Sequence, residues 1–201
     1  MATSSADFSD TMPAGTKAPA FALPDVTSGT TLSLAELAGP KGTLIVFLCG
    51  HCPYVVHVRE LLKSLSEEYS TKGISTVGVS SNDAVAYPAD APDKLREMAL
   101  SSGFAFPVLY DESQDVARAY TAVCTPDFFL FDADHTLAYR GRLDASSPKN
   151  GQPLTGDDLR KALEAVASGL PVSEPWPPAL GCSIKWKALS LIHISEPTRP
   201  Y

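Results

Sequence analysis

The sequence predicts a single layered α/β domain, and three observations carry this prediction. The chain has 201 residues and is 44% hydrophobic, which suffices for one well-buried core and is short for two independent domains. Between residues 43 and 120, short apolar runs alternate with segments of helical periodicity. Residues 128–166 then show a strand, strand, helix pattern. Repeated strand and helix is typical of sheets covered by helices.

The first elements surround the most distinctive part of the chain. Ala18–Leu23 and Thr31–Leu37 alternate apolar and polar residues around Ser28-Gly29, which predicts an N-terminal hairpin. Thr43–Leu48 is continuously apolar, as expected for a strand covered on both faces. Apolar residues then recur at spacings of three and four, which predicts an amphipathic helix over Pro53–Tyr69.

The remaining elements continue the alternation toward the C-terminus. They are expected as strand 74–80, helix 93–101, strand 104–109, helix 113–120 and strands 128–131 and 137–142. Thr155 and Asp158 have the spacing of a capping box that opens a last helix. Residues 80–93 are polar and contain prolines, so we expect a surface loop that could overhang a site.

The strongest chemical signal is Cys49-Gly50-His51-Cys52-Pro53, at the junction of the predicted strand and helix. Pro53 suits the first helical position, so Cys52 would lie beside unpaired N–H groups at the positive end of the helix dipole. This position is expected to lower the pKa of the Cys52 thiol below its free value of about 8.5. A protonated His51 would add positive charge. Cys52 is therefore the expected nucleophile, and Cys49 the first candidate to resolve a mixed disulfide.

Four segments resemble the peroxiredoxin-like branch of the thioredoxin superfamily, the redoxin or AhpC-TSA type. They are Phe47–Val55, Cys124–Asp132, Tyr139–Asp144 and Gly181–Lys187. The resemblance extends from about Gly15 to Lys187. It implies a thioredoxin-like fold with a central mixed sheet, flanking helices and an N-terminal hairpin extension.

The resemblance also implies further site residues. Thr125-Pro126 stands in the place of the cis-proline loop that faces the reactive cysteine. Thr125, Pro126, His51 and Pro53 are therefore candidate substrate-binding residues. Cys124, on the same loop, is the second candidate for the resolving cysteine or a packing residue.

The sequence departs from its relatives at the reactive positions. Cys52 takes the place of both the first thioredoxin cysteine and the peroxidatic cysteine, while Val55 stands where thioredoxin has its second cysteine. Cys49 and Pro126 stand where peroxiredoxins carry a threonine and an arginine. The set of residues that activates peroxide is thus incomplete.

The leading interpretation is a thiol-disulfide oxidoreductase of cell redox homeostasis. It would act on a protein disulfide or a peroxide and recover its electrons from a cellular dithiol donor of the thioredoxin or glutathione type. The alternatives are a peroxiredoxin-like thiol peroxidase and a non-catalytic binding module that holds a metal through Cys49, His51, Cys52 and His57. The spacing lacks the paired clusters of structural zinc sites, so no metal or other cofactor is expected.

Composition limits the partners and the location. The net charge is −7 and the chain contains no dense run of Lys or Arg, which argues against binding to nucleic acid or to an anionic membrane surface. Neither a signal peptide nor an apolar run of about 18 residues is visible. We therefore expect a cytoplasmic protein, in which four cysteines do not indicate a disulfide framework.

Four regions are expected along the chain. They are a flexible N-terminus 1–14, a redoxin domain 15–170, a Pro-rich C-terminal segment 171–188 and a disordered tail 189–201. Leu189–Arg199 looks like the translation of a sequencing adapter, so the tail is expected to be artefactual. Cys182 is expected to be a tail cysteine without a redox role. Arg140 and Arg142 alternate along a strand and are expected to point to solvent.

Overall fold

A computed structural model describes residues 11–188, and the terminal residues 1–10 and 189–201 lie outside the described part. The expected artefactual tail therefore lies outside it, as does most of the expected flexible N-terminus. The elements in chain order are β1 (Ala22–Pro24), β2 (Thr31–Ser33), α1 (Leu34–Leu37), β3 (Gly42–Phe47), α2 (Pro53–Ser70), β4 (Ile74–Ser80), the 3-10 helix η2 (Pro88–Asp90), α3 (Pro92–Ser102), β5 (Val108–Tyr110), α4 (Asp115–Ala119), β6 (Cys124–Thr125), β7 (Asp127–Asp132), β8 (Leu137–Gly141), α5 (Asp157–Ala167) and β9 (Cys182–Ser183).

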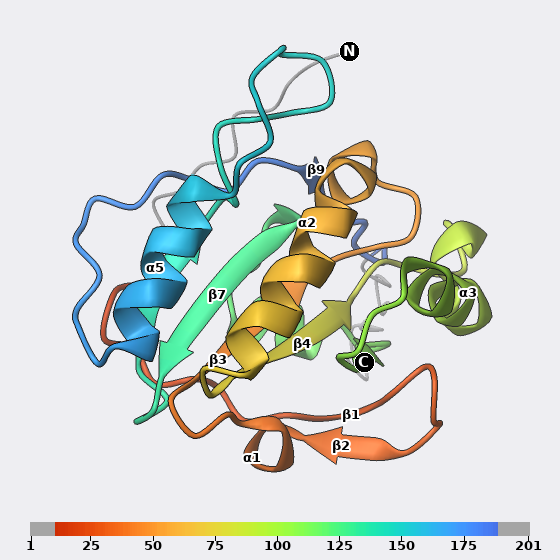
Figure 1. The fold of residues 1–201 in the computed structure, drawn as a ribbon. Helices are drawn as coiled ribbons and strands as arrows, with labels where there is room; N and C mark the ends of the chain where they lie inside the picture. Colours follow the sequence, from red (N-terminus) through yellow and green to blue (C-terminus); the bar gives the residue numbers. More distant parts are fainter. Residues whose placement is uncertain (1–10, 189–201) are drawn as a thin grey trace, which may run out of the picture.

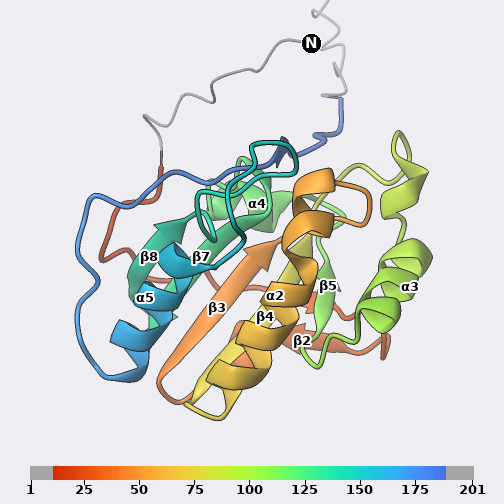
Figure 2. The same cartoon turned by 45° about the horizontal axis from the view of Figure 1, so that its top comes forward.

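A five-stranded mixed sheet in the order β5-β4-β3-β7-β8 forms the centre of the fold. Strands β3, β4 and β5 run parallel, and β7 runs antiparallel to both β3 and β8. Helices α2 and α5 cover one face, while α4 lies behind the sheet (Figures 1 and 2). The predicted α/β class, the mixed sheet and the antiparallel hairpin β1-β2 are confirmed.

The central strand β3 separates two cores. Leu44 and Val46 pack toward α2, α3 and α5, whereas Ile45 and Phe47 pack toward α4 and the N-terminal segment. This alternation follows from the two-residue period of a strand, and all six residues of β3 are buried. A strand buried on both faces holds the cysteine turn that follows it in a fixed position.

Two expectations about element ends are wrong. The strand expected over 104–109 begins only at Val108, since Pro107 has no N–H to donate to a neighbouring strand. Helix α5 begins after Gly156, at φ 73°, and has no side-chain capping bond from Thr155. Instead, the Asp144 carboxylate accepts the N–H groups of Thr155 at 2.7 Å and Gly156 at 2.6 Å.

The Pro-rich C-terminal segment turns back over the domain and crosses it to the cysteine end of the sheet (Figure 1). Trp176 packs against Tyr139, with ring centroids 5.9 Å apart. The segment then forms β9, which pairs antiparallel with β6 so that Cys182 lies opposite Thr125. Neither β6 nor β9 is predicted by the sequence, because each has only two residues and no visible periodicity.

Candidate active site

Cys52 lies where β3 passes into α2, at the N-cap of the helix, with Pro53 in the first turn. The pKa of the Cys52 thiol is lowered, first by a hydrogen bond from the Cys49 thiol. The Cys182 thiol and the backbone N–H groups of Val55 and Cys182 add to this effect, and burial opposes it. A neighbouring thiol is therefore the first of several groups that favour the Cys52 thiolate.

The reactive turn is closed over by the loop that contains Thr125 and Pro126. The Cys52 thiol donates to the Thr125 carbonyl oxygen at 3.1 Å, and the Cys49 sulfur lies 3.3 Å from the Thr125 hydroxyl. The Thr125–Pro126 peptide bond is cis. Only 1% of the surface of Cys49 and of Cys52 is exposed. A thiolate cannot donate a hydrogen bond, so the Cys52 sulfur loses its bond to the Thr125 carbonyl when it ionises. The thiolate then accepts hydrogen bonds from the donors that lower its pKa.

The remaining thiols have different environments. Burial raises the pKa of the Cys124 thiol, which donates to the Pro126 carbonyl at 3.7 Å. Cys124 and Thr125 are consecutive in β6, so their side chains lie on opposite faces of the strand. Cys182 is half-buried, and burial together with its hydrogen bond to Cys52 raises the pKa of its thiol to about 12. The structure thus brings Cys49, Cys52 and Cys182 together, and the sequence did not identify Cys182.

Asp90 is a second residue that sequence reasoning missed. It is fully buried, although the loop around it was expected at the surface. Its carboxylate accepts the Gly50 N–H at 2.9 Å and the Asn82 amide at 2.8 Å, and it pairs with His51 Nδ1 at 2.8 Å. The His51 ring also stacks on Tyr87, with centroids 6.3 Å apart. Asp90 therefore fixes the Cys49–Cys52 turn, and His51 is directed toward Asp90.

The residues around the cysteine turn are poorly suited to hold a metal ion. Donor atoms of Cys49, His51 and Asp90 lie within 4.8 Å of one another. Each of the three already hydrogen-bonds to protein groups, and the Asp90 oxygens are taken up by Gly50, Asn82 and His51. His57, the fourth residue of the alternative metal-binding set, hydrogen-bonds to Ser146 at 3.0 Å.

Both arginines are paired with carboxylates. The expectation that Arg140 points to solvent is wrong, because it is buried and donates to the Thr121 carbonyl at 2.7 Å and to Asp127 at 3.2 Å. Burial raises the pKa of Asp127 to about 6, against the opposing effect of Arg140. Arg142 is half-buried and pairs with Asp158 at 2.7 Å.

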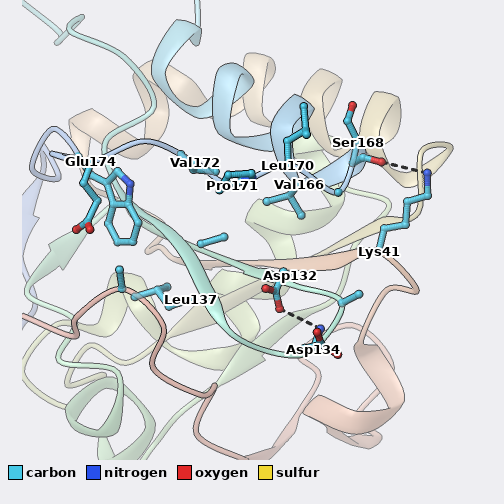
Figure 3. A pocket seen from close by; sticks show the side chains of 16 residues that line it. Lys41, Asp132, Asp134, Leu137, Val166, Ser168, Leu170, Pro171, Val172 and Glu174 are labelled. Carbon is cyan, nitrogen blue, oxygen red and sulfur yellow. Dashed lines mark hydrogen bonds between the residues drawn. The ribbon is translucent and has the colours of Figure 1, made fainter.

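A hollow of about 680 Å³ lies at the other end of the sheet (Figure 3). Lys41, Asp132, Val166, Leu170 and Trp176 are among the residues that line it. Lys41 precedes β3 while Cys49 follows it, and six extended residues span roughly 20 Å. The hollow is therefore separate from the cysteine site.

Comparison with known proteins identifies the family. Residues 13–154 match the Redoxin family. The chain belongs to the redoxin family. Over 108 residues this redoxin is 30% identical to "Putative peroxiredoxin MT2597" of Mycobacterium tuberculosis, a match that covers 54% of the chain and 63% of the relative. The predicted resemblance to peroxiredoxin-like proteins is confirmed.

Solved structures agree with this assignment. An uncharacterized conserved protein from Geobacillus kaustophilus is 48% identical, with a TM-score of 0.86 and coverage of 89% of this redoxin and 94% of that chain. The hypothetical protein SMc02350 from Sinorhizobium meliloti 1021 is 41% identical, also with a TM-score of 0.86, over 89% and 97% of the two chains. Peroxidoxin BcpB from Mycobacterium tuberculosis shares the fold, with a TM-score of 0.59. It is 21% identical, and the match covers 78% of this redoxin and 97% of that chain.

These likenesses confirm the thioredoxin-like fold and a thiol oxidoreductase or peroxidase family. Among residues 11–188, no helix is long and apolar enough to cross a membrane.

Proposed function

We propose that this redoxin is a thiol-disulfide oxidoreductase in which Cys52 is the nucleophile. The observation that carries the proposal is the position of the Cys52 sulfur, which lies at the start of α2 and is stabilised as thiolate by Cys49, Val55 and Cys182. The thiolate is the attacking form of cysteine. Its pKa is lowered, whereas those of Cys49, Cys124 and Cys182 are raised, so at neutral pH Cys52 is the most reactive of the four.

The proposed reaction has two exchanges. The Cys52 thiolate attacks one sulfur of a substrate disulfide, and the other substrate sulfur leaves as a thiolate. A second thiol of the site then attacks the Cys52 sulfur, releases the remaining substrate thiolate and leaves an intramolecular disulfide. A cellular dithiol donor of the thioredoxin or glutathione type returns two electrons. The cytoplasm is the proposed location, because its reducing conditions supply such donors.

The surrounding residues have proposed roles in this reaction. Cys49 and Cys182 lie in or against the same buried cluster as Cys52, and the thiols of both help to lower its pKa, so either is a candidate for the second sulfur. Cys124 is not part of the proposal, because its thiol is directed to the Pro126 carbonyl. Thr125 and Pro126 border the Cys52 sulfur and are proposed to contact the substrate, together with His51 and Pro53 at the turn.

A peroxiredoxin-like peroxidase is the second candidate, favoured by the peroxiredoxin names of the relatives. In that case the Cys52 thiolate attacks a peroxide oxygen, an alcohol or water leaves, and Cys52 becomes a sulfenic acid. The peroxidase ranks second because Pro126 occupies the position of the peroxiredoxin arginine, and Arg140 is held by Asp127.

Parallel assays test the proposal. Insulin disulfide reduction with dithiothreitol as donor measures exchange, and hydrogen peroxide consumption with thioredoxin or glutathione as donor measures peroxidase activity. We expect exchange activity that Cys52→Ser abolishes, since no other thiol has a lowered pKa. Exchange that persists in Cys52→Ser would contradict the proposal, and peroxide consumption alone would establish the second candidate.

A further inference from the structure

The C-terminal segment delivers a third sulfur to the reactive turn. Strand β9 pairs with β6 so that Cys182 lies opposite Thr125, the residue whose carbonyl accepts from the Cys52 thiol. Cys182 packs against the buried cluster that contains Cys52, and its thiol and backbone N–H help to lower the pKa of the Cys52 thiol. Figure 1 shows β9 beside the first turn of α2, although the two are distant in sequence.

The docking of this segment is specific. A Cβ atom on Gly181 would lie 2.1 Å from the Thr125 carbonyl oxygen, so a side chain at this position would displace the strand. Beyond Cys182, Ile184 is buried and its N–H donates to the Val123 carbonyl at 3.1 Å. The Lys185 N–H donates to the Asn82 side chain at 2.9 Å. Cys182 is therefore held against Cys52 from both sides.

Cys182 is better placed than Cys49 to complete an exchange. Cys49 is fully buried, and its pKa is raised by its hydrogen bond to Cys52, by burial and by the charge of Asp90. Cys182 is half-buried, and Lys185 lowers the pKa of its thiol in part. The rate of exchange depends on the thiolate fraction and on access. A disulfide to Cys182 also presents a sulfur that a reducing partner can reach.

We propose that Cys182 is the resolving cysteine for Cys52, so that the C-terminal segment completes the active site. The proposal rests on the proposed role of Cys52 as the nucleophile. The Cys182 thiolate attacks the Cys52 sulfur of the mixed disulfide, the Cys52–Cys182 bond forms and the substrate sulfur leaves as a thiolate. With peroxide as the oxidant, the Cys182 thiol and the Cys52 sulfenic acid form the same disulfide and release water.

The docked segment also bears on access to Cys52. The Cys52 sulfur is enclosed, with the Thr125 carbonyl against it and β9 paired to Thr125. In the proposed reaction, β9 is the element that moves aside to admit a substrate sulfur. A strand of two residues has few backbone bonds to break, and such elements open more easily than core strands. After the first exchange, the return of β9 brings Cys182 to the mixed disulfide.

Disulfide mapping in the full chain tests the assignment. The reduced protein is treated with one equivalent of hydrogen peroxide, free thiols are blocked with iodoacetamide, and linked peptides are identified by mass spectrometry. We expect a Cys52–Cys182 linkage. A Cys49–Cys52 linkage as the main product would overturn the proposal.

Variants separate this inference from the proposed function. Cys182→Ala should accumulate the mixed disulfide on Cys52 and lower turnover about 1,000-fold, because a donor at micromolar concentration replaces a thiol held at a millimolar effective concentration. Cys124→Ala, a buried thiol on the facing strand, is the matched control and should keep its turnover. Gly181→Ala retains all four thiols and should lose the Cys52–Cys182 linkage.

The outcomes are distinguishable. If turnover depends on Cys52 but is unchanged in Cys182→Ala, the resolving role of Cys182 is refuted and the proposed function is retained. If turnover persists in Cys52→Ser, both the resolving role of Cys182 and the proposed function are refuted.

Discussion

The thiol of Cys49 is the largest single cause of the lowered pKa of Cys52, so its removal is the sharpest test of the electrostatics of the site. Cys49→Ala removes the thiol that favours the Cys52 anion as a hydrogen-bond donor. Hydrogen bonds to charged groups contribute about 1.5–3 kcal/mol, and one pKa unit corresponds to about 1.4 kcal/mol. Loss of a donor destabilises the thiolate, so the pKa of Cys52 should rise by roughly one to two units.

The assay follows thiolate absorbance in the ultraviolet and the rate of iodoacetamide labelling of Cys52 as functions of pH. Below the ordinary thiol pKa of about 8.5, the parent protein should label as a thiolate. Cys49→Ala should shift the midpoint upward and slow labelling at acidic pH by roughly 10- to 100-fold, while Cys124→Ala should leave the midpoint in place. An unchanged or lowered midpoint in Cys49→Ala would refute the role given to the Cys49 thiol.

Two further predictions concern stability, measured by urea unfolding. Asp90→Ala leaves the Gly50 N–H and the Asn82 amide without their acceptor. At about 1–3 kcal/mol for each unsatisfied donor, the free energy of unfolding should fall by about 2–6 kcal/mol. Asp90→Asn keeps an acceptor oxygen and should cost less, and equal losses would contradict this reason. Asp144→Ala removes the carboxylate that accepts two N–H groups at the start of α5 and should cost about 1–2 kcal/mol, with most of it restored in Asp144→Asn.

The sequence predicts those parts of the fold that depend on local periodicity. The strand expected over residues 74–80 has the bounds of β4, and the helix expected over Pro53–Tyr69 differs from α2 by one residue. Burial on both faces of β3 follows from its continuous apolar run. The position of Cys52 at a helix start is also local, because the strand, Pro53 and the helical stripe adjoin it in sequence.

The remaining parts of the site depend on contacts between distant residues. Asp90 is forty positions from Gly50, in a segment whose polarity favours a surface loop. Asp90 can be buried because its carboxylate accepts the Gly50 N–H. A local sequence pattern does not show this pairing. Cys182 meets Cys52 through a strand pairing of two residues, so neither helical nor strand periodicity marks it. The positions of both residues are determined by how loops that are distant in sequence pack against the cysteine turn.

The groups that lower the pKa of Cys52 also affect the reduction potential of any disulfide that Cys52 forms. Donors from Cys49 and Cys182 stabilise the thiolate, which belongs to the reduced protein and has no equivalent in the disulfide. Stabilisation of the reduced form makes a disulfide more oxidising. A Cys52–Cys182 disulfide should therefore be reduced readily by a dithiol donor. Its formation is then most favourable with an oxidising substrate, such as a strained disulfide or a peroxide. This preference links the two candidate activities through one sulfur.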